Sequence, residues 1–246
     1  MALREELERS GNWLFRWRSY LPILTIGMAL IALGHFHYPG RRHHYDELWE
    51  SLCLTISIAG LLIRAYTVGC APKGTSGRNV SNQVANVLTT SGMYSVVRHP
   101  LYLGNFLMAF GISLFPRTWW LPVLYVLIFW LYYERIMFAE EEFLREKFGQ
   151  SYLSWAARTP AFFPRFKRWQ PPEMPFSLRW ALRREYASFA AMILVFALLE
   201  EVSEFIVHGK FVIDRMWTIL ISVTLVSYVV VRFLSKKTHL LDVKGR

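Results

Sequence analysis

Long apolar blocks, separated by polar connections, dominate the chain. A helix that crosses a bilayer needs roughly 17–25 mostly apolar residues, and several blocks approach or reach that length. They span residues 21–33 with their flanks, 48–68, 101–115, 119–138, 186–207 and 216–234. The third block is short, and a turn at residues 116–118 joins it to the fourth as a helical hairpin. This pattern predicts an all-α, polytopic integral membrane protein with about six transmembrane helices.

Two polar segments also have helical periodicity. Residues 139–157 are charged but place large apolar side chains at helical spacing, which predicts a cytosolic helix at the membrane interface. Residues 3–17 form a charged amphipathic segment before the first apolar block. No small-residue cleavage site follows it, so we expect a retained helix and not a signal peptide.

A proline-rich stretch follows residues 139–157 and interrupts helical structure. Its prolines are Pro160, Pro164, Pro171, Pro172 and Pro175. Aromatic and basic side chains are mixed there: Phe162, Phe163, Phe166 and Trp169 stand among Arg165, Lys167 and Arg168. An interfacial lid or anchor and a linker that follows the protein surface explain this composition equally well.

Composition and charge support a membrane protein. Of the 246 residues, 54% are hydrophobic, and the formal net charge is +10. With the N-terminus in the cytoplasm, most basic residues fall inside, and those outside are Arg41, Arg42, Arg117, Lys210 and Arg215. This asymmetry follows the positive-inside rule and predicts that both termini are cytosolic. No nucleic-acid recognition motif accompanies the charge, so we expect the bilayer, and no nucleic acid, as the partner of these cations.

The two cysteines, Cys53 and Cys70, lie near opposite ends of one predicted helix. At 1.5 Å per residue they are roughly 25 Å apart, too far for a disulfide within that helix. Two cysteines also exclude a cysteine-rich metal site, and we expect no bound metal.

The most informative polar cluster lies directly ahead of the third apolar block and contains Arg98, His99, Tyr94 and Tyr102. Pro100 suits the first position of a helix and pushes the residue before it towards an extended conformation. The free backbone N–H groups of such a helix start favour anionic or polar ligand atoms. Taken alone, the segment is explained almost as well as a capped helix start with basic anchors.

Three adjacent acids, Glu140, Glu141 and Glu142, follow the fourth apolar block. Adjacent carboxylates on one helix project in different directions, so at most two can face one site. Taken alone, acids at the start of a new helix only match the helix dipole and remain solvated.

The two clusters together resemble a known family. The first reads Arg98-His99-Pro100-Leu101-Tyr102-Leu103-Gly104. About a hairpin later the chain reads Glu140-Glu141-x-x-Leu144-x-x-x-Phe148-Gly149-x-x-Tyr152, and then Arg158-Thr159-Pro160-Ala161-Phe162-Phe163-Pro164. In this order and spacing, over residues 88–166, the motifs resemble the isoprenylcysteine carboxyl methyltransferase and phospholipid methyltransferase superfamily. Trp155 departs from the family pattern, which often has tyrosine there, but preserves an aromatic wall.

The resemblance implies an S-adenosylmethionine site between membrane helices on the cytosolic side. By that similarity the cofactor pocket would be lined by Tyr94, Arg98, His99, Pro100, Tyr102, Leu103, Gly104, Glu140 and Glu141. Glu141 is preferred over Glu142, which falls at a variable position of the motif. We expect three parts: N-terminal membrane helices with a cytosolic connection (1–86), a methyltransferase core with the cofactor site (87–170) and a C-terminal pair of membrane helices (171–246). The resemblance covers the core, and the helices on either side of it are not diagnostic.

The methyl acceptor follows less directly from the sequence. Arg158 resembles the family's acceptor-side arginine, and we predict that Arg158 and Glu141 are catalytic. Residues 74–79 resemble an anion-binding loop in which Arg78 would hold a lipid phosphate, and they also fit a plain flexible loop. An anionic acceptor needs orientation by a cation and no general base, whereas an amine must lose a proton, which His99 could accept.

We therefore expect an S-adenosylmethionine-dependent methyltransferase that acts on a lipid, with a phosphate or carboxylate of the headgroup as acceptor. The alternatives are a protein-S-isoprenylcysteine carboxyl O-methyltransferase, a phospholipid amine N-methyltransferase, and a lipid-binding or transport protein without the chemistry. Arg64 must face protein, water or a headgroup. Interfacial solvation explains Glu200, Glu201 and Glu204 more simply than ion transport.

Overall fold

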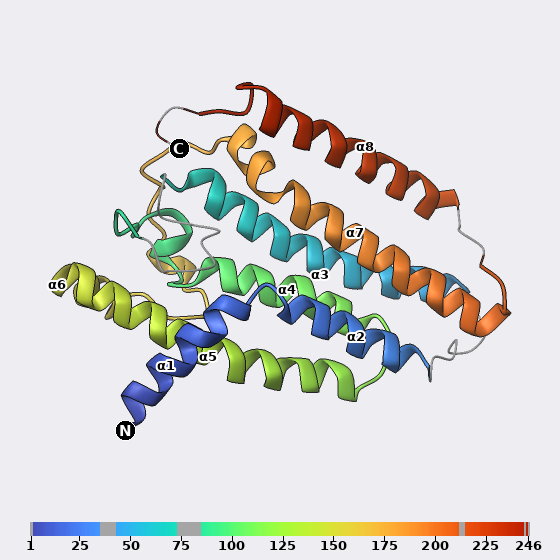
Figure 1. Ribbon diagram of the computed structural model, residues 1–246, viewed down its shortest axis with the longest axis horizontal. Coiled ribbons are helices and arrows are strands. Elements are labelled where there is room, and N and C mark those ends of the chain that lie inside the picture. The colour runs from blue at the N-terminus through green and yellow to red at the C-terminus, as the bar shows by residue number, and fades with distance from the viewer. Residues whose placement is uncertain (1, 35–42, 73–84, 212–214, 244, 246) are drawn as a thin grey trace.

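A computed structural model describes residues 2–34, 43–72, 85–211, 215–243 and 245, with the side chains of residues 43–47 excepted. Within these ranges all regular structure is helical (Figure 1), which confirms the predicted all-α class. The helices are α1 (Leu3–Trp17), α2 (Leu21–Leu33), α3 (His43–Cys70), η2 (Gly92–Ser95), α4 (Pro100–Leu114), α5 (Trp120–Phe148), α6 (Gln150–Ala156), η3 (Phe166–Arg168), α7 (Leu178–His208) and α8 (Arg215–Lys237).

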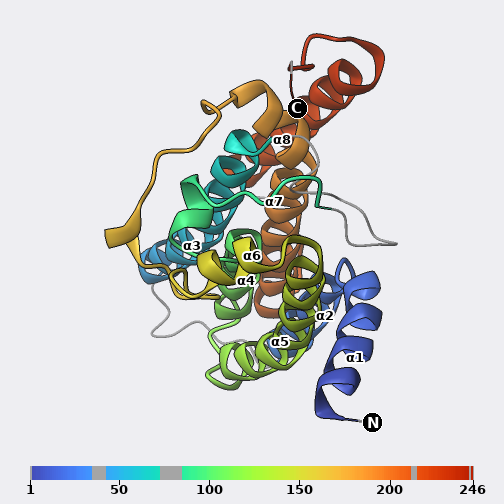
Figure 2. The ribbon, with the colours of Figure 1, turned by 90° about the vertical axis from the view of Figure 1, so that its left-hand side faces the viewer.

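The long helices run side by side and form an elongated bundle (Figure 1). At its centre α3 packs against α4 and α7, while α8 lies on the outer side of α7 and α1 lies along α5. Segments 85–99 and 157–177 cross the end of the bundle where α3 ends and where α4 and α7 begin (Figure 2). We call this end, which contains η2, the η2 end.

Among the described residues, three helices are long and apolar enough to cross a membrane: residues Leu48–Cys70 of α3, α5 and α8. The helices α2 and α4 are also apolar but shorter. These helices support an integral membrane protein, whereas the predicted count of spans is not confirmed.

The predicted boundary between a membrane helix at 119–138 and a separate interfacial helix at 139–157 is wrong, because α5 continues unbroken from Trp120 to Phe148. Residues 139–148 are mostly good helix formers and include no glycine or proline that would end the helix. The break comes at Gly149, whose φ of +54° favours glycine. The three acids therefore lie on the last turns of a long helix and not at the start of a new one.

Helices α3 and α4 approach closely because glycines lie at their contact. A Cβ atom at Gly104 would lie 2.4 Å from Arg64 Cγ and 2.7 Å from the Gly60 carbonyl oxygen. One at Gly111 would lie 2.4 Å from the Cys53 carbonyl oxygen. Larger side chains at these positions would force the two backbones apart.

We expect Gly104→Ala to destabilise the protein by about 1–3 kcal/mol, because overpacking a tight contact displaces its neighbours. Gly27→Ala in α2 is the matched control: no atom lies within 4 Å of its Cβ position, and alanine is the better helix former. Thermal unfolding of both variants in one detergent measures the difference. Equal melting temperatures would contradict the close packing of α4 on α3.

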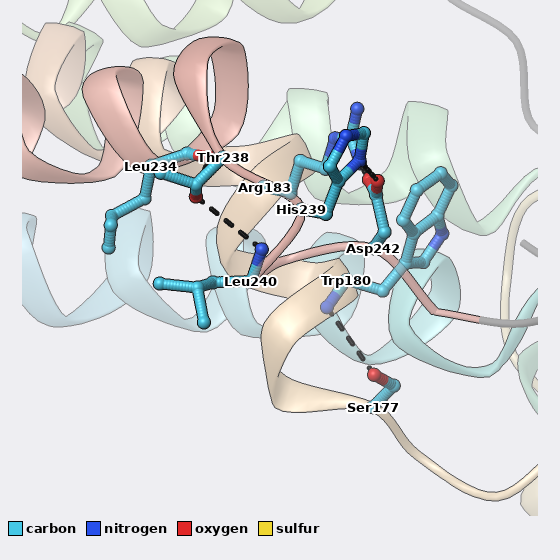
Figure 3. Close-up of polar contacts among 8 residues, drawn as sticks. All are labelled: Ser177, Trp180, Arg183, Leu234, Thr238, His239, Leu240 and Asp242. Carbon is cyan, nitrogen blue, oxygen red and sulfur yellow. Dashed lines mark hydrogen bonds and ion pairs between the residues drawn. The ribbon is translucent and has the colours of Figure 1, made fainter.

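After α8 the chain turns back over the first turns of α7 (Figure 3). Asp242 forms an ion pair with Arg183, and its Oδ2 lies 2.7 Å from His239 Nδ1. The Ser177 hydroxyl caps α7 by accepting from the Trp180 N–H at 3.4 Å. The C-terminal segment thus fastens the start of α7 at the η2 end.

Candidate functional site

The start of α4 adopts the conformation that its sequence dictates. Pro100 takes the first helical position, and His99 before it has φ −119° and ψ 62°, outside the helical region that a following proline disfavours. The backbone N–H groups of Arg98 and His99 donate to the carbonyl oxygens of Pro160 at 2.9 Å and Ala161 at 3.2 Å. The proline-rich stretch therefore lies beside the start of α4 and holds it.

Glu141, near the end of α5, joins two side chains from the start of α4. Its Oε1 lies 2.9 Å from His99 Nε2, and its Oε2 accepts from Arg98 Nη1 at 2.9 Å. The His99 side chain is only 5% exposed, while those of Arg98 and Glu141 are 20% and 24% exposed. Segments 42 residues apart in the sequence thus build one buried, charged cluster, which we call the His99 cluster.

Glu140 and Tyr102 contact the same imidazole, and Tyr94 lies near Glu140. Glu140 Oε2 lies 3.5 Å from His99 Nδ1, and the Tyr102 ring stacks on the imidazole with ring centres 5.5 Å apart. Burial, followed by the negative charge of Glu140, raises the pKa of Tyr94. The Tyr94 hydroxyl therefore stays protonated and remains a hydrogen-bond donor. The indole N–H of Trp155 donates to the Tyr94 carbonyl at 3.0 Å and ties α6 to this segment.

Opposing effects act on the pKa of His99. Burial alone would lower it, but hydrogen bonds to Glu140 and Glu141 and the charges of both acids outweigh burial and raise the pKa above its ordinary value. The imidazolium, which donates from both ring nitrogens, is therefore favoured between the two carboxylates.

We expect this cluster to make stability depend on pH. The pKa of His99 is raised in the folded protein. Its contribution to the free energy of unfolding is therefore fully present below its pKa in the unfolded chain, roughly 6.5, and is lost as pH rises through its pKa in the folded protein. The difference in melting temperature between wild type and His99→Gln should therefore shrink as pH rises from about 6 to about 9. His239→Gln is the control, since its side chain is 97% exposed. A difference for His99→Gln that is constant with pH would contradict the expectation.

Two buried donor groups at the cluster, Arg98 Nε and the Tyr152 hydroxyl, make no hydrogen bond of ordinary geometry with the described residues, although the Tyr152 hydroxyl lies near the Glu141 carboxylate. Burial, followed by the charge of nearby Glu141, raises the pKa of Tyr152, so its hydroxyl also stays protonated. A buried donor without a partner costs roughly 1–3 kcal/mol. Such donors therefore mark a place where a polar ligand atom fits. A recess lies between the end of α3 and residues 89–94, and Thr89 and Tyr94 line part of it. The buried Thr89 hydroxyl also has no hydrogen-bond partner in the described chain.

A second polar network lies behind the His99 cluster. Arg64 of α3 forms a bidentate ion pair with Glu185 of α7, with N–O distances of 2.8 and 3.0 Å, and also donates to the Asn105 side-chain oxygen. Asn105 in turn donates to the Tyr133 hydroxyl of α5 at 3.3 Å, and the Tyr133 ring lies 4.9 Å from that of Tyr102. The sequence left open whether Arg64 faces protein, water or a lipid headgroup, and the structure shows that it faces protein.

The chain is similar in sequence to several known proteins. The family model described as phospholipid methyltransferase matches residues 71–151. The nickel-cobalt-cadmium resistance protein NccN of Alcaligenes xylosoxydans xylosoxydans is 31% identical over 157 residues, which cover 63% of this chain and 68% of that protein. The protein-S-isoprenylcysteine O-methyltransferase of Schizosaccharomyces pombe is 30% identical over 95 residues, 36% of this chain and 40% of that enzyme. The chain belongs to the isoprenylcysteine carboxyl methyltransferase and phospholipid methyltransferase superfamily.

The superfamily match covers part of each relative. The cobalt-zinc-cadmium resistance protein CzcN of Cupriavidus metallidurans is 33% identical over 147 residues, 58% of this chain and 61% of that protein. The chain therefore spans less than two thirds of the length of several superfamily relatives. No solved structure matches the chain.

The structure gathers most of the residues that the superfamily motifs single out. Those at or next to the start of α4 and the end of α5 are Tyr94, Arg98, His99, Pro100, Tyr102, Glu140 and Glu141. Two others also belong to the first turns of α4 but face different neighbours: Leu103 is buried in the aromatic core, and Gly104 faces α3. Packing against α3 therefore accounts for the small size of Gly104, and its predicted place in the cofactor pocket stays a prediction.

Of the two predicted acceptor-side residues, the structure describes Arg158. Arg158 is exposed, and its Nε donates to the Ser154 carbonyl oxygen at 3.1 Å, so its role in catalysis stays a prediction. Arg78 lies outside the described residues. Glu142 turns away from His99 and forms ion pairs with Arg4 of α1 and, at 3.5 Å, with Arg145.

Sequence reasoning missed Tyr152 as a site residue and the pairing of Arg64 with Glu185. Tyr152 stands in the second superfamily motif, and its place after the Gly149 break was the available signal. Glu185 is an acid at the border of a basic run and an apolar block, which is a weak signal. Its partner lies 121 residues away and cannot be found from local pattern.

Proposed function

We propose that the chain is a membrane-embedded methyltransferase that uses S-adenosylmethionine, and that the cofactor binds at the His99 cluster. The observation that carries the proposal is the buried Arg98 Nε, which has no hydrogen-bond partner in the described chain. Beside it and the Glu141 carboxylate lies the Tyr152 hydroxyl, which makes no hydrogen bond of ordinary geometry there. Membership of the superfamily supports the reaction class.

The residues present fit the charges of this cofactor. Arg98 Nε and the Tyr152 hydroxyl would hold its carboxylate, together with backbone N–H groups at the start of α4. Glu140, whose side chain is 31% exposed, would accept from its ammonium or ribose hydroxyls. The ring of Tyr94 offers a face for adenine. When bound, the cofactor would supply an electrophilic methyl group on a sulfonium sulfur.

The chain's own residues would then align the reactants and exclude water. Glu141 holds the Arg98 guanidinium and the His99 imidazole in fixed positions, so the donors around it are preorganised. Phe162 would close the site on the side of the aromatic core, because its ring centre lies 5.6 Å from that of Phe106 and 5.9 Å from that of Phe129. Alignment and dryness are the main requirements of an in-line methyl transfer.

We propose a lipid with a phosphate or carboxylate in its headgroup as the methyl acceptor. An anion needs no general base, and Arg158 and Arg78 are the cations proposed to orient it, with Arg158 and Glu141 as the catalytic residues. The relatives named protein-S-isoprenylcysteine O-methyltransferases support an alternative acceptor, the carboxylate of a lipidated cysteine. The phospholipid methyltransferase model supports a phospholipid amine. A lipid-binding or transport protein is the non-enzymatic alternative, and it predicts no cofactor binding.

We also propose that residues 87–170 form the methyltransferase core, between membrane helices of 1–86 and 171–246. The termini and the site would face the cytosol. Helix α1, the start of α4 and the end of α8 all lie at the η2 end (Figure 1), as cytosolic termini on the side of the site would require.

Incubating reconstituted protein with methyl-labelled S-adenosylmethionine and total lipid extract, followed by chromatography, tests this function. We expect label in an anionic lipid fraction. Label in protein alone would indicate that the acceptor is a lipidated cysteine, and label in an amine lipid would indicate N-methylation. Absence of label from every fraction, together with no binding of S-adenosylhomocysteine, would reject the enzyme.

A further inference from the structure

Backbone hydrogen bonds fasten residues 160–170 to the segment that leads into α4. The Arg165 N–H donates to the Val96 carbonyl oxygen at 3.0 Å, and the Gly92 N–H donates to the Gln170 carbonyl oxygen at 3.0 Å. These two bonds fix residues 165 and 170, so the backbone between them is held at both ends. Its outward side chains therefore have a fixed backbone beneath them.

Exposed aromatic rings and cations alternate on this stretch, and the Arg168 guanidinium also donates to the Arg158 carbonyl oxygen. The exposed rings are Phe163 (73%), Phe166 (67%) and Trp169 (42%). The exposed cations between them are Arg165, Lys167 and Arg168. In the part of the chain that the structure describes, no carboxylate forms an ion pair with these cations. We call these six side chains the 163–169 surface.

This surface lies at the level where the helices of the bundle end. Trp169 packs on Tyr66 of α3, four residues before that helix ends, with ring centres 6.0 Å apart. Phe176 stacks on the same tyrosine ring at 5.9 Å. The segment after α6 runs along the outer edge of the η2 end, on the side of α3 (Figure 2). Aromatic rings concentrate at membrane–water boundaries, and basic side chains there attract anionic headgroups.

We propose that the 163–169 surface docks on the headgroups of anionic phospholipids in the surrounding bilayer. The rings lie at the boundary of the acyl region, and the cations contact the phosphates. The positive charge is complementary to such a surface, and the last turn of a membrane-spanning helix places it at headgroup depth. Because the stretch is bonded to residues 92–96, docking also holds the segment before His99 at the membrane surface.

Quenching of Trp169 by brominated lipids tests the proposal. Full-length protein is reconstituted in nanodiscs of brominated phosphatidylglycerol or brominated phosphatidylcholine, and the Trp169→Phe variant gives the signal of the other tryptophans. We expect the Trp169 signal to be quenched about threefold more by the anionic lipid at low salt, and the preference to vanish at about 0.5 M salt. Arg165→Gln/Lys167→Gln/Arg168→Gln should also abolish the preference.

The matched control is Arg179→Gln/Lys236→Gln/Lys237→Gln, which removes as many exposed cations from the same end of the bundle. This variant should keep the preference for anionic lipid. Both triple variants should bind S-adenosylhomocysteine as wild type does, which shows that they are folded and separates this surface from the cofactor site. Equal quenching by the two lipids would overturn the proposal. Absence of Trp169 quenching by both lipids would also overturn the proposal and would favour a soluble partner, such as an acidic protein, for this surface.

Discussion

We expect Glu141→Gln to lower the affinity for S-adenosylhomocysteine by about 100-fold, the largest effect of any single substitution at the site. The carboxylate of Glu141 accepts from Arg98 and lies 2.9 Å from a ring nitrogen of His99. A neutral amide keeps the shape of the side chain but loses the negative charge. Its NH2 group cannot accept, so at most one of the two hydrogen bonds remains. Arg98 and His99 would then lose the orientation that presents their remaining donors to the cofactor. Isothermal titration calorimetry on the purified variants measures the change.

Glu142→Gln is the matched control for this prediction. Glu142 is the next residue on the same helix, but it faces Arg4 and Arg145 and not His99. Its substitution by Gln should leave the affinity within about threefold of wild type, because its ion-pair partners, Arg4 and Arg145, are not part of the proposed cofactor site. Equal losses of affinity in the two variants would show that the acids act through their total negative charge and not through the His99 cluster.

The largest expected effect on stability belongs to Arg64→Met, which we expect to destabilise the protein by about 3–5 kcal/mol. The substitution removes the bidentate partner of Glu185, whose side chain is 7% exposed, and leaves a buried carboxylate without compensation. It also takes a donor away from Asn105, which links the pair to Tyr133. Unfolding by heat or by added denaturing detergent measures the loss.

The double variant Arg64→Met/Glu185→Leu separates the ion pair from simple packing. Replacing both partners by apolar residues of similar volume removes the uncompensated charge, so the double variant should regain most of the stability. Losses that simply add, with the double variant less stable than either single variant, would contradict the view that unpaired charge dominates the effect.

Local sequence patterns predicted the elements whose cause is local. The apolar blocks specify where helices form, and Pro100 specifies where α4 begins. The spacing of the two motifs also paired Glu140 and Glu141 with His99, because the hairpin of α4 and α5 returns the chain to the same end of the bundle. A turn of residues 116–118 is enough to set that geometry.

Features set by tertiary contacts were missed. The charge of residues 139–148 suggested a new helix, yet no residue there breaks α5, and Gly149 was the real boundary. The α1 helix packs on α5 and pairs its Arg4 with Glu142, a contact across 138 residues that no local pattern signals. The partner of Arg64 likewise depends on how α7 packs against α3.

An experimental structure of the protein with bound S-adenosylhomocysteine tests the central claim most directly. The account predicts ligand density at the η2 end between the start of α4 and the end of α5, with polar contacts to Arg98 Nε, the Tyr152 hydroxyl and Glu140. Density at any other place in the bundle, with the His99 cluster untouched, would contradict it.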